Sequence, residues 1–288
     1  MHTPGFESIQ TVMARVVDRV DALHRLTADG KIAGVATGLR DLDRMLLGLQ
    51  PGKLAIVAGG FMAGKTAFMV NAAVHATCAA GLAVGVFTLE SDSFSLARRI
   101  LANAGAMDGH RLRTGDLPGE YWPKMTDALK RLEGARLQIA GPDGLDTVKG
   151  LCARAEALAV QYASLDLLAV DNIRLLRDAD AARCLKRLAQ ALRCPVLATT
   201  PLGGPARSGG KGRPLLQGIP GEFADDADVV LLIDREELRY PGSCEAGTAT
   251  VTVARHRNGP MGTVRLAFDR ATARFSDFDD RPGLQPAR

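Results

Sequence analysis

Residues 59–66 form a glycine-rich segment whose spacing suits the binding of a phosphate chain. The segment reads Gly59, Gly60, Phe61, Met62, Ala63, Gly64, Lys65 and Thr66, which fits the pattern G-x-x-x-x-G-K-[ST] in full. Glycines let backbone N–H groups approach an anion without side-chain clashes, and a following helix adds the positive end of its dipole. Lys65 would place a positive charge on the terminal phosphates, and Thr66 would offer its hydroxyl to Mg²⁺. The segment therefore predicts a site for a nucleoside triphosphate.

Two carboxylates follow apolar runs further along the chain. Glu90 ends the run 82–89, and Asp171 ends the run 165–170. Because ligands of open α/β sheets gather at the carboxyl ends of parallel strands, both side chains are candidates for the same site. Glu90 could orient or deprotonate the water that attacks the γ-phosphate, or it could cap the helix that begins near Ser93. Asp171 would hold Mg²⁺, directly or through water.

The elements that must position these residues alternate between strands and helices. The expected strands are 53–58, 82–89, 137–140, 165–171, 194–200, 227–233, 248–253, 263–268 and 274–278. The expected helices are 6–26, a short one within 34–52, 67–80, a region 94–133 interrupted near 113–119, 147–162 and 181–193. This order implies an α/β fold with a mostly parallel central sheet flanked by helices and an antiparallel C-terminal extension.

Residues 6–26 predict an amphipathic helix that stands apart from the other elements. Its apolar residues fall on one face; they are Phe6, Ile9, Val12, Met13, Val16, Val17, Val20 and Leu23. A polar, glycine-containing stretch then ends the helix, so we divide the chain into a helix and linker 1–30, a domain 31–278 and a polar tail 279–288. The apolar face must be buried on this domain or on a neighbouring subunit, and composition does not separate the two.

Composition limits the class of protein. The 288 residues, of which 47% are hydrophobic, are enough for a sizeable core. No apolar run of about 18 residues is present and the N-terminus is polar, so we expect a cytoplasmic protein without a membrane partner. The cysteines lack metal-binding or disulfide spacing, and we expect small core residues; they are Cys78, Cys152, Cys184, Cys194 and Cys244.

One segment concentrates positive charge. The net charge of +4 is too small to argue nucleic-acid binding unaided. Residues 201–221, however, are rich in glycine and proline and carry Arg207, Lys211 and Arg213 without an acidic residue. Such a loop could follow the phosphodiester backbone of single-stranded DNA. It could equally be a solvated linker, because it contains no aromatic side chain that would stack on a base.

Several other stretches occur in the order of a known family. They are 34–38 with 41–43 and 48–51, 87–90, 113–115 with Trp122, and 257–260 with 262–266. From about residue 6 to residue 278 the chain resembles the C-terminal ATPase domain of the DnaB replicative helicase family, which has a RecA-like fold. The resemblance implies that Lys65 and Thr66 bind ATP and Mg²⁺, that Glu90 is the catalytic base and that Asp171 is the Walker B metal residue.

The resemblance also implies assembly. Arg257 resembles the arginine finger that reaches the γ-phosphate of the adjoining subunit, and Arg255 stands where the family usually has a lysine with a similar role. The helix 6–26 resembles the family's linker helix, which docks on the next subunit of a hexameric ring. We expect this chain to lack the family's separate N-terminal helical domain, which supports the ring and engages primase, because the sequence begins at the stretch that resembles the linker helix. Because the adjoining subunit supplies this arginine finger, ATP hydrolysis would depend on assembly of the subunits.

Two stretches depart from the family pattern. Residues 172–174 read Asn-Ile-Arg where the family has Tyr-Leu-Gln, and Thr200-Pro201 stand in place of Ser-Gln. Proline cannot replace the hydrogen bonds of a glutamine amide, so coupling to DNA is expected to be weakened while nucleotide binding is intact.

We therefore predict an ATP-dependent DNA helicase or translocase that acts as a homo-oligomeric ring on single-stranded DNA. An alternative is a truncated helicase-like ATPase that docks on a full-length replicative helicase, or on other replication proteins, as a loader or inhibitor. A RecA-like recombination or regulatory ATPase shares the fold but fits the C-terminal hairpin motif less well.

Overall fold

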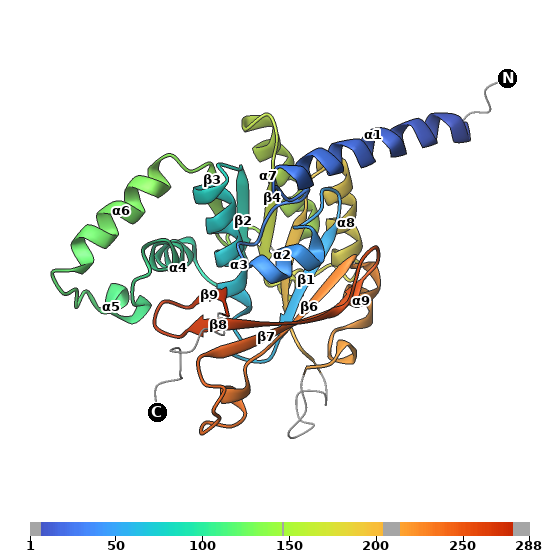
Figure 1. The fold of residues 1–288 in the computed structure, drawn as a ribbon. Coiled ribbons are helices and arrows are strands. Elements are labelled where there is room, and N and C mark those ends of the chain that lie inside the picture. The colour runs from blue at the N-terminus through green and yellow to red at the C-terminus, as the bar shows by residue number, and fades with distance from the viewer. Residues whose placement is uncertain (1–6, 146, 204–213, 279–288) are drawn as a thin grey trace.

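Apolar strands assemble into a nine-stranded mixed sheet at the centre of the protein (Figure 1). A computed structural model describes residues 7–145, 147–203 and 214–278. The strands are β1 (Leu54–Gly59), β2 (Val84–Thr88), β3 (Leu137–Ala140), β4 (Leu167–Asp171), β5 (Val196–Pro201), β6 (Val229–Asp234), β7 (Thr248–His256), β8 (Gly262–Asp269) and β9 (Arg274–Asp277). Their order is β3-β2-β4-β5-β1-β6-β7-β8-β9. Neighbours from β3 to β6 are parallel and those from β6 to β9 are antiparallel, which confirms the predicted sheet.

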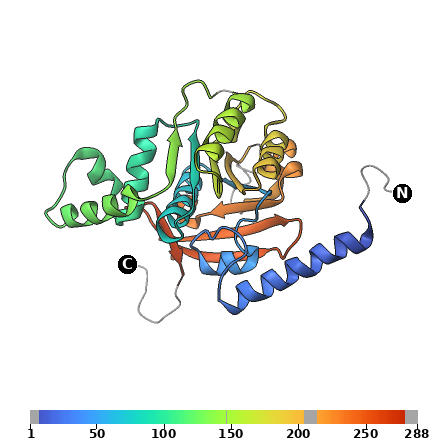
Figure 2. The same cartoon turned by 90° about the horizontal axis from the view of Figure 1, so that it is seen from above.

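Helices cover both faces of this sheet. They are α1 (Ile9–Ala28), α2 (Arg40–Leu46), α3 (Lys65–Val74), α4 (Ser93–Gly105), α5 (Gly109–Thr114), α6 (Tyr121–Glu133), α7 (Val148–Gln161), α8 (Ala181–Leu192) and α9 (Gly221–Asp226). Short turns are the π-helical η1 (His75–Ala79) and the 3-10 helices η2 (Ile173–Leu175), η4 (Leu216–Gly218) and η5 (Glu236–Leu238). Seen from above, α7 and α8 lie on one side of the sheet and α2 on the other (Figure 2). The predicted helices and strands are confirmed to within a few residues at their ends.

The central strand β1 shows why its sequence is apolar throughout. Ala55 and Val57 face the core that includes residues of α2, α3 and α4, whereas Leu54, Ile56 and Ala58 face the core that includes residues of α7 and α8. A strand covered on both faces has no solvent-exposed position for polar residues. Because a shift of one residue would exchange the two faces, packing fixes the register of β1. The position of the loop that follows β1 is fixed with it.

Helix α1 extends away from the other elements (Figures 1 and 2). Its apolar face is exposed, and the exposed fractions are 66% for Ile9, 50% for Met13, 45% for Val16, 57% for Val17 and 58% for Val20. The domain of the same chain therefore does not bury this face. For the described residues, the alternative in which the helix packs on its own domain is wrong. A contiguous exposed apolar face is typical of an interaction site.

The cysteines are only partly core residues. Cys194 is buried, and burial raises the pKa of its thiol to about 12. Cys78, Cys152 and Cys184 are half-buried, whereas Cys244 is exposed. The prediction of a core position is wrong for Cys244, because it lies in the connection between β6 and β7 rather than in a packed strand or helix.

None of the helices described reaches the length and apolar character needed to cross a membrane.

Candidate active site

The glycine-rich segment turns the chain from β1 into α3 at the carboxyl edge of the parallel strands. Gly64 has a φ of 103°, and a Cβ built there would lie 3.0 Å from the ring of Phe275, so this position requires glycine. A Cβ on Gly60 would meet no atom of the described part of the chain within 4 Å, so this side of the loop is open with respect to those residues. Among the described residues, no side chain forms a capping hydrogen bond at the start of α3. The N–H groups of its first turn are therefore suited to an anion such as a phosphate.

Lys65 lies within the loop that it was predicted to serve. Its Nζ donates hydrogen bonds to the carbonyl oxygens of Gly60, at 2.9 Å, and Gly59, at 3.3 Å. Burial lowers the pKa of Lys65, and the charges of Glu90 and Asp171 oppose this shift. The ammonium group thus lies close to both predicted carboxylates. A bound polyphosphate would give this desolvated charge an anionic partner.

Asp171 ends β4 beside the first turn of α3. Its Oδ2 accepts a hydrogen bond from Thr66 Oγ1 at 2.9 Å, and its Oδ1 accepts one from Thr199 Oγ1 at 2.5 Å. Burial raises the pKa of Asp171, although both hydrogen bonds oppose the shift. A hydroxyl and a carboxylate are the hard oxygen donors that Mg²⁺ prefers. The pair is therefore suited to Mg²⁺, which usually takes its remaining ligands from water and substrate phosphates.

Replacing Asp171 by asparagine is expected to stabilise the nucleotide-free protein and to impair Mg²⁺-dependent nucleotide binding. Asparagine removes a desolvated charge and can still bond both threonine hydroxyls, so we expect Tm to rise by about 2–4 °C, or ~1 kcal/mol. Nucleotide affinity in Mg²⁺ should fall by about 10-fold or more. Thermal unfolding and nucleotide titration measure the two effects. The exposed Asp143→Asn variant is the control, and a lower Tm for Asp171→Asn would contradict this account.

The raised pKa of Asp171 predicts how the stability of the protein changes with pH. Because its pKa is raised in the folded state, the folded protein holds this proton more tightly than the unfolded chain does. The cost of ionising Asp171 is therefore present above the raised pKa and disappears as the pH falls below it. The difference in Tm between Asp171→Asn and the wild type should shrink as the pH falls through the raised pKa of Asp171 towards the ordinary pKa of an aspartate.

Glu90 lies just beyond β2, next to the end of β4. The two strands are adjacent, with Thr88 opposite Asp171, so the residues that follow them meet at the same edge. Glu90 is exposed, and its Oε2 accepts a hydrogen bond from Asn172 Nδ2 at 3.1 Å. The alternative role of Glu90 as a helix cap is wrong, because the side chain of Asp92 caps α4 by accepting from the N–H of Ser95 at 2.7 Å.

Three further side chains support the site without having been predicted to do so. Thr199 bonds Asp171, and Asn172 bonds Glu90. Arg235 is only 5% exposed; its guanidinium lies 3.9 Å from the centre of the Phe268 ring and donates to the carbonyl of Met62 at 3.1 Å. This contact connects the glycine-rich loop to the C-terminal strands. The only sequence signal for any of the three was the departure from the family pattern at Asn172.

The two arginines of the finger prediction are not at this edge. In the sheet, Gly59 pairs with Ile233 of β6, whereas His256 of β7 pairs with Val229 of the same strand. Val229 and Ile233 are four residues apart, or ~13 Å along a strand. Arg255 and Arg257 therefore lie towards the opposite edge of the sheet from Lys65. Within one chain the structure does not bring them together with the glycine-rich loop.

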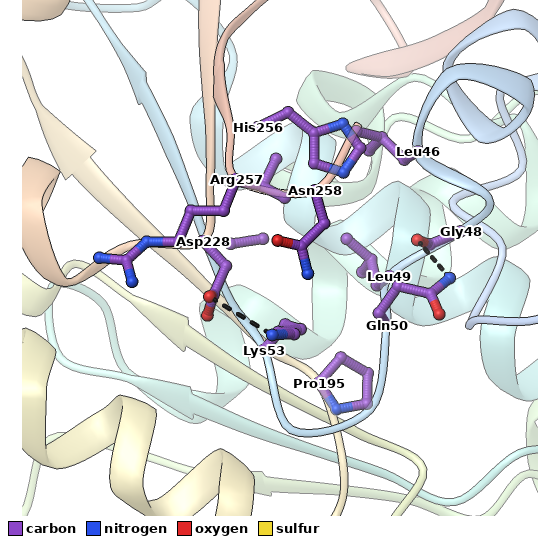
Figure 3. Close-up of a pocket in the computed structure, with 12 residues that line it drawn as sticks. Leu46, Gly48, Leu49, Gln50, Lys53, Pro195, Asp228, His256, Arg257 and Asn258 are labelled. Atoms are coloured by element: carbon purple, nitrogen blue, oxygen red, sulfur yellow. Dashed lines mark hydrogen bonds and ion pairs between the residues drawn. The ribbon is translucent and has the colours of Figure 1, made fainter. Parts of the chain in front are cut away.

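Both arginines rest on the end of α9. Arg257 Nη2 donates to the carbonyl of Asp225 at 2.7 Å, and Arg255 Nη1 donates to the carbonyl of Ala224 at 2.5 Å. Arg257 is exposed. Figure 3 shows it beside a cavity whose lining includes Lys53 and Asp228. With a volume of about 50 Å³, this cavity is far too small for a nucleotide.

The predicted DNA-binding residues Arg207, Lys211 and Arg213 lie outside the described residues. The departure at Pro201 is described, since Pro201 ends β5 and pairs with Gly59 in β1. Pro201 is therefore directly beside the start of the glycine-rich loop.

Comparison with known proteins assigns the family. A model of the DnaB-like helicase C-terminal domain matches residues 34–277. The chain belongs to the DnaB-like helicase C-terminal domain family. Relatives of this family include the replicative DNA helicase DnaB of Geobacillus stearothermophilus, which is 30% identical over 296 residues and is covered to 64%, with 97% of this chain aligned. The replicative DNA helicase DnaB of Pasteurella multocida is 32% identical, and the alignment covers 98% of this chain and 63% of that protein. The chain thus spans just under two thirds of these relatives.

Solved structures have the same fold. One of them, an ATPase domain, superposes with a TM-score of 0.85 at 24% identity, covering 95% of this chain and all of that domain. A DnaB-like replicative helicase, in a structure whose title names its interactions with primase, gives a TM-score of 0.83 at 24% identity, covering 95% of this chain and 68% of that one. The predicted RecA-like fold is therefore confirmed.

Proposed function

We propose that this chain is the ATPase part of a DNA helicase or translocase that hydrolyses ATP between the subunits of a ring on single-stranded DNA. The observation that carries the proposal is a divided set of residues. Lys65, Asp171 and Glu90 meet at the carboxyl edge of the parallel strands, whereas Arg257 lies towards the opposite edge. A head-to-tail contact between copies would bring one edge to the other.

In this proposal each side chain has a defined task. Lys65 and the first-turn N–H groups of α3 would bind the phosphates, and Thr66 with Asp171 would hold Mg²⁺. The bound ion would neutralise charge on the phosphate oxygens. Glu90 would take a proton from a water molecule while the oxygen of that water molecule forms a bond to the γ-phosphorus. The bond from that phosphorus to the bridging oxygen of ADP would break, which releases ADP and phosphate.

Assembly would supply the remaining groups. Arg257, with Arg255 beside it, would stabilise the charge of the transferred phosphoryl group in the next subunit. The exposed apolar face of α1 would be buried on that subunit, as a heterologous contact that closes into a ring. Relatives named replicative DNA helicases support single-stranded DNA and replication proteins such as primase as partners.

The experiment that tests this function is ATP hydrolysis with and without single-stranded DNA over a range of salt concentrations. We expect DNA to stimulate hydrolysis severalfold and salt to weaken the stimulation, because phosphate contacts release counterions. A mass measurement of the same sample with ATP should give a ring. Equal rates with and without DNA at every salt concentration would rule out the motor function.

The alternative, a helicase-like ATPase that docks on a full-length replicative helicase, is favoured by one observation. Pro201 occupies the strand position beside Gly59 at which the family has a glutamine, and proline offers no amide to the nucleotide or to the DNA loops. Co-purification with a full-length helicase, together with no unwinding by this chain alone, would favour the alternative over the motor.

A further inference from the structure

We propose that Asn172 is a positioning residue that holds the carboxylate of Glu90 over the active site. The inference rests on the proposed ATP hydrolysis, in which Glu90 is the base. It concerns Asn172, which directly follows Asp171 at the end of β4. This side chain places a short amide directly after the carboxylate that is proposed to hold Mg²⁺.

The amide of Asn172 is fixed from both of its ends. Its Oδ1 accepts a hydrogen bond from the backbone N–H of Arg174 at 3.3 Å, which caps η2, and its Nδ2 donates to Glu90 Oε2 at 3.1 Å. The opposite orientation would place an oxygen against the carboxylate and an amide N–H against a backbone N–H, and both pairs repel. With only 9% of its surface exposed, Asn172 has little freedom to leave this position.

Glu90 needs such a restraint because it is itself exposed. The negative charge of Asp171 acts against the approach of the Glu90 carboxylate to the site, because like charges repel. An exposed glutamate also has several rotamers that point into water, and each of them lowers the population of the rotamer that faces the active site. The bond from Asn172 favours the rotamer that keeps the carboxylate beside Asp171 and Lys65.

The geometry also gives the two carboxylate oxygens of Glu90 different hydrogen-bonding roles. Oε2 receives the amide hydrogen of Asn172, which leaves Oε1 to accept the hydrogen of the attacking water. A misplacement of about 1 Å in such a base costs up to ~100-fold in rate. Asn172 therefore acts on turnover through Glu90 and has no direct part in nucleotide binding.

Asn172→Asp separates this role from the cap of η2. Aspartate keeps the size of the side chain and the oxygen that accepts from Arg174, but it replaces the donor by a second negative oxygen facing Glu90. We expect kcat for ATP to fall about 10- to 100-fold, while KM and the dissociation constant of ATP change by less than about twofold. Gln138→Glu is the matched control, because it makes the same amide-to-acid change at an exposed position of β3 and should leave kcat unchanged.

A double-mutant cycle with Glu90→Gln, measured by single-turnover hydrolysis, tests whether Asn172 acts through Glu90. We expect Asn172→Asp to add less than about twofold to the loss caused by Glu90→Gln. An unchanged kcat in Asn172→Asp, an equal further loss in the Glu90→Gln background, or a parallel loss of ATP affinity and Tm would each overturn the inference. A wild type that binds ATP without hydrolysing it would overturn the proposed function as well, so the two failures are distinguishable.

Discussion

Replacement of Lys65 by alanine is expected to abolish ATP hydrolysis and to weaken ATP binding by about 100-fold or more. Lys65 is half-buried, and its ammonium group donates to two carbonyls of the glycine-rich loop, where it would meet the phosphates. Its removal also takes away a positive charge on which the charges of Glu90 and Asp171 act, so these two carboxylates would repel a polyphosphate more strongly.

Nucleotide titration and hydrolysis assays measure the effect of Lys65→Ala. Lys149→Ala is the matched control, since Lys149 is an exposed lysine at the start of α7. Its affinity for ATP should equal that of the wild type. If Lys65→Ala retained the affinity of the wild type for ATP, the glycine-rich loop would not be the phosphate site.

Arg257→Ala is expected to lower hydrolysis by about 10³- to 10⁵-fold, as the loss of an arginine finger does, while ATP binding changes little. Arg257 lies towards the opposite edge of the sheet, so its removal takes nothing from the nucleotide site of its own chain. The side chain is exposed and bonds one backbone carbonyl, so the stability of the monomer should change by less than ~1 kcal/mol.

Arg183→Ala provides the comparison for Arg257→Ala. Arg183 is an exposed arginine of α8 that forms an ion pair with Asp226 at 3.6 Å, at the end of the same helix α9. Its removal should leave turnover unchanged. Wild-type turnover in Arg257→Ala would show that Arg257 is not a finger.

The strands could be predicted because their physical signal is local. A strand buried on both faces lacks the alternation of polar and apolar residues. β1 contains no polar side chain, and those of β2 and β4 are confined to their last residues, Thr88 and Asp171. The glycine-rich loop could be predicted for a similar reason, since Gly64 needs a positive φ that glycine alone adopts without strain. Both signals lie within a few residues of the feature that they predict.

The supporting contacts of the site could not be predicted because they join distant parts of the chain. Thr199 reaches Asp171 only through the pairing of β4 with β5, and Arg235 reaches Met62 only through the pairing of β1 with β6. A single sequence does not contain the order of strands in a sheet. The separation of Arg257 from the glycine-rich loop within one chain also depends on the order of the strands, and only the resemblance to a family with a finger from the neighbouring subunit pointed to it.

The surroundings of α1 and the role of Glu90 illustrate two other limits. Periodicity predicts the apolar face of α1 but carries no information on what covers it, and the structure leaves that face exposed. For Glu90 the sequence left a base and a helix cap as alternatives. The hydrogen bond from Ser95 to Asp92 decides against the cap, because a helix needs only one such residue at its start.

A mixture of two inactive variants tests the claim of a shared active site most directly. Subunits with Lys65→Ala keep Arg257, and subunits with Arg257→Ala keep the phosphate loop, so an interface between them can be complete. In randomly mixed rings about a quarter of the interfaces would combine both intact halves. We predict that hydrolysis is absent in each variant alone and recovers to roughly that fraction of the wild-type rate in an equal mixture. No recovery at any mixing ratio, with rings shown to exchange subunits, would contradict hydrolysis at subunit interfaces.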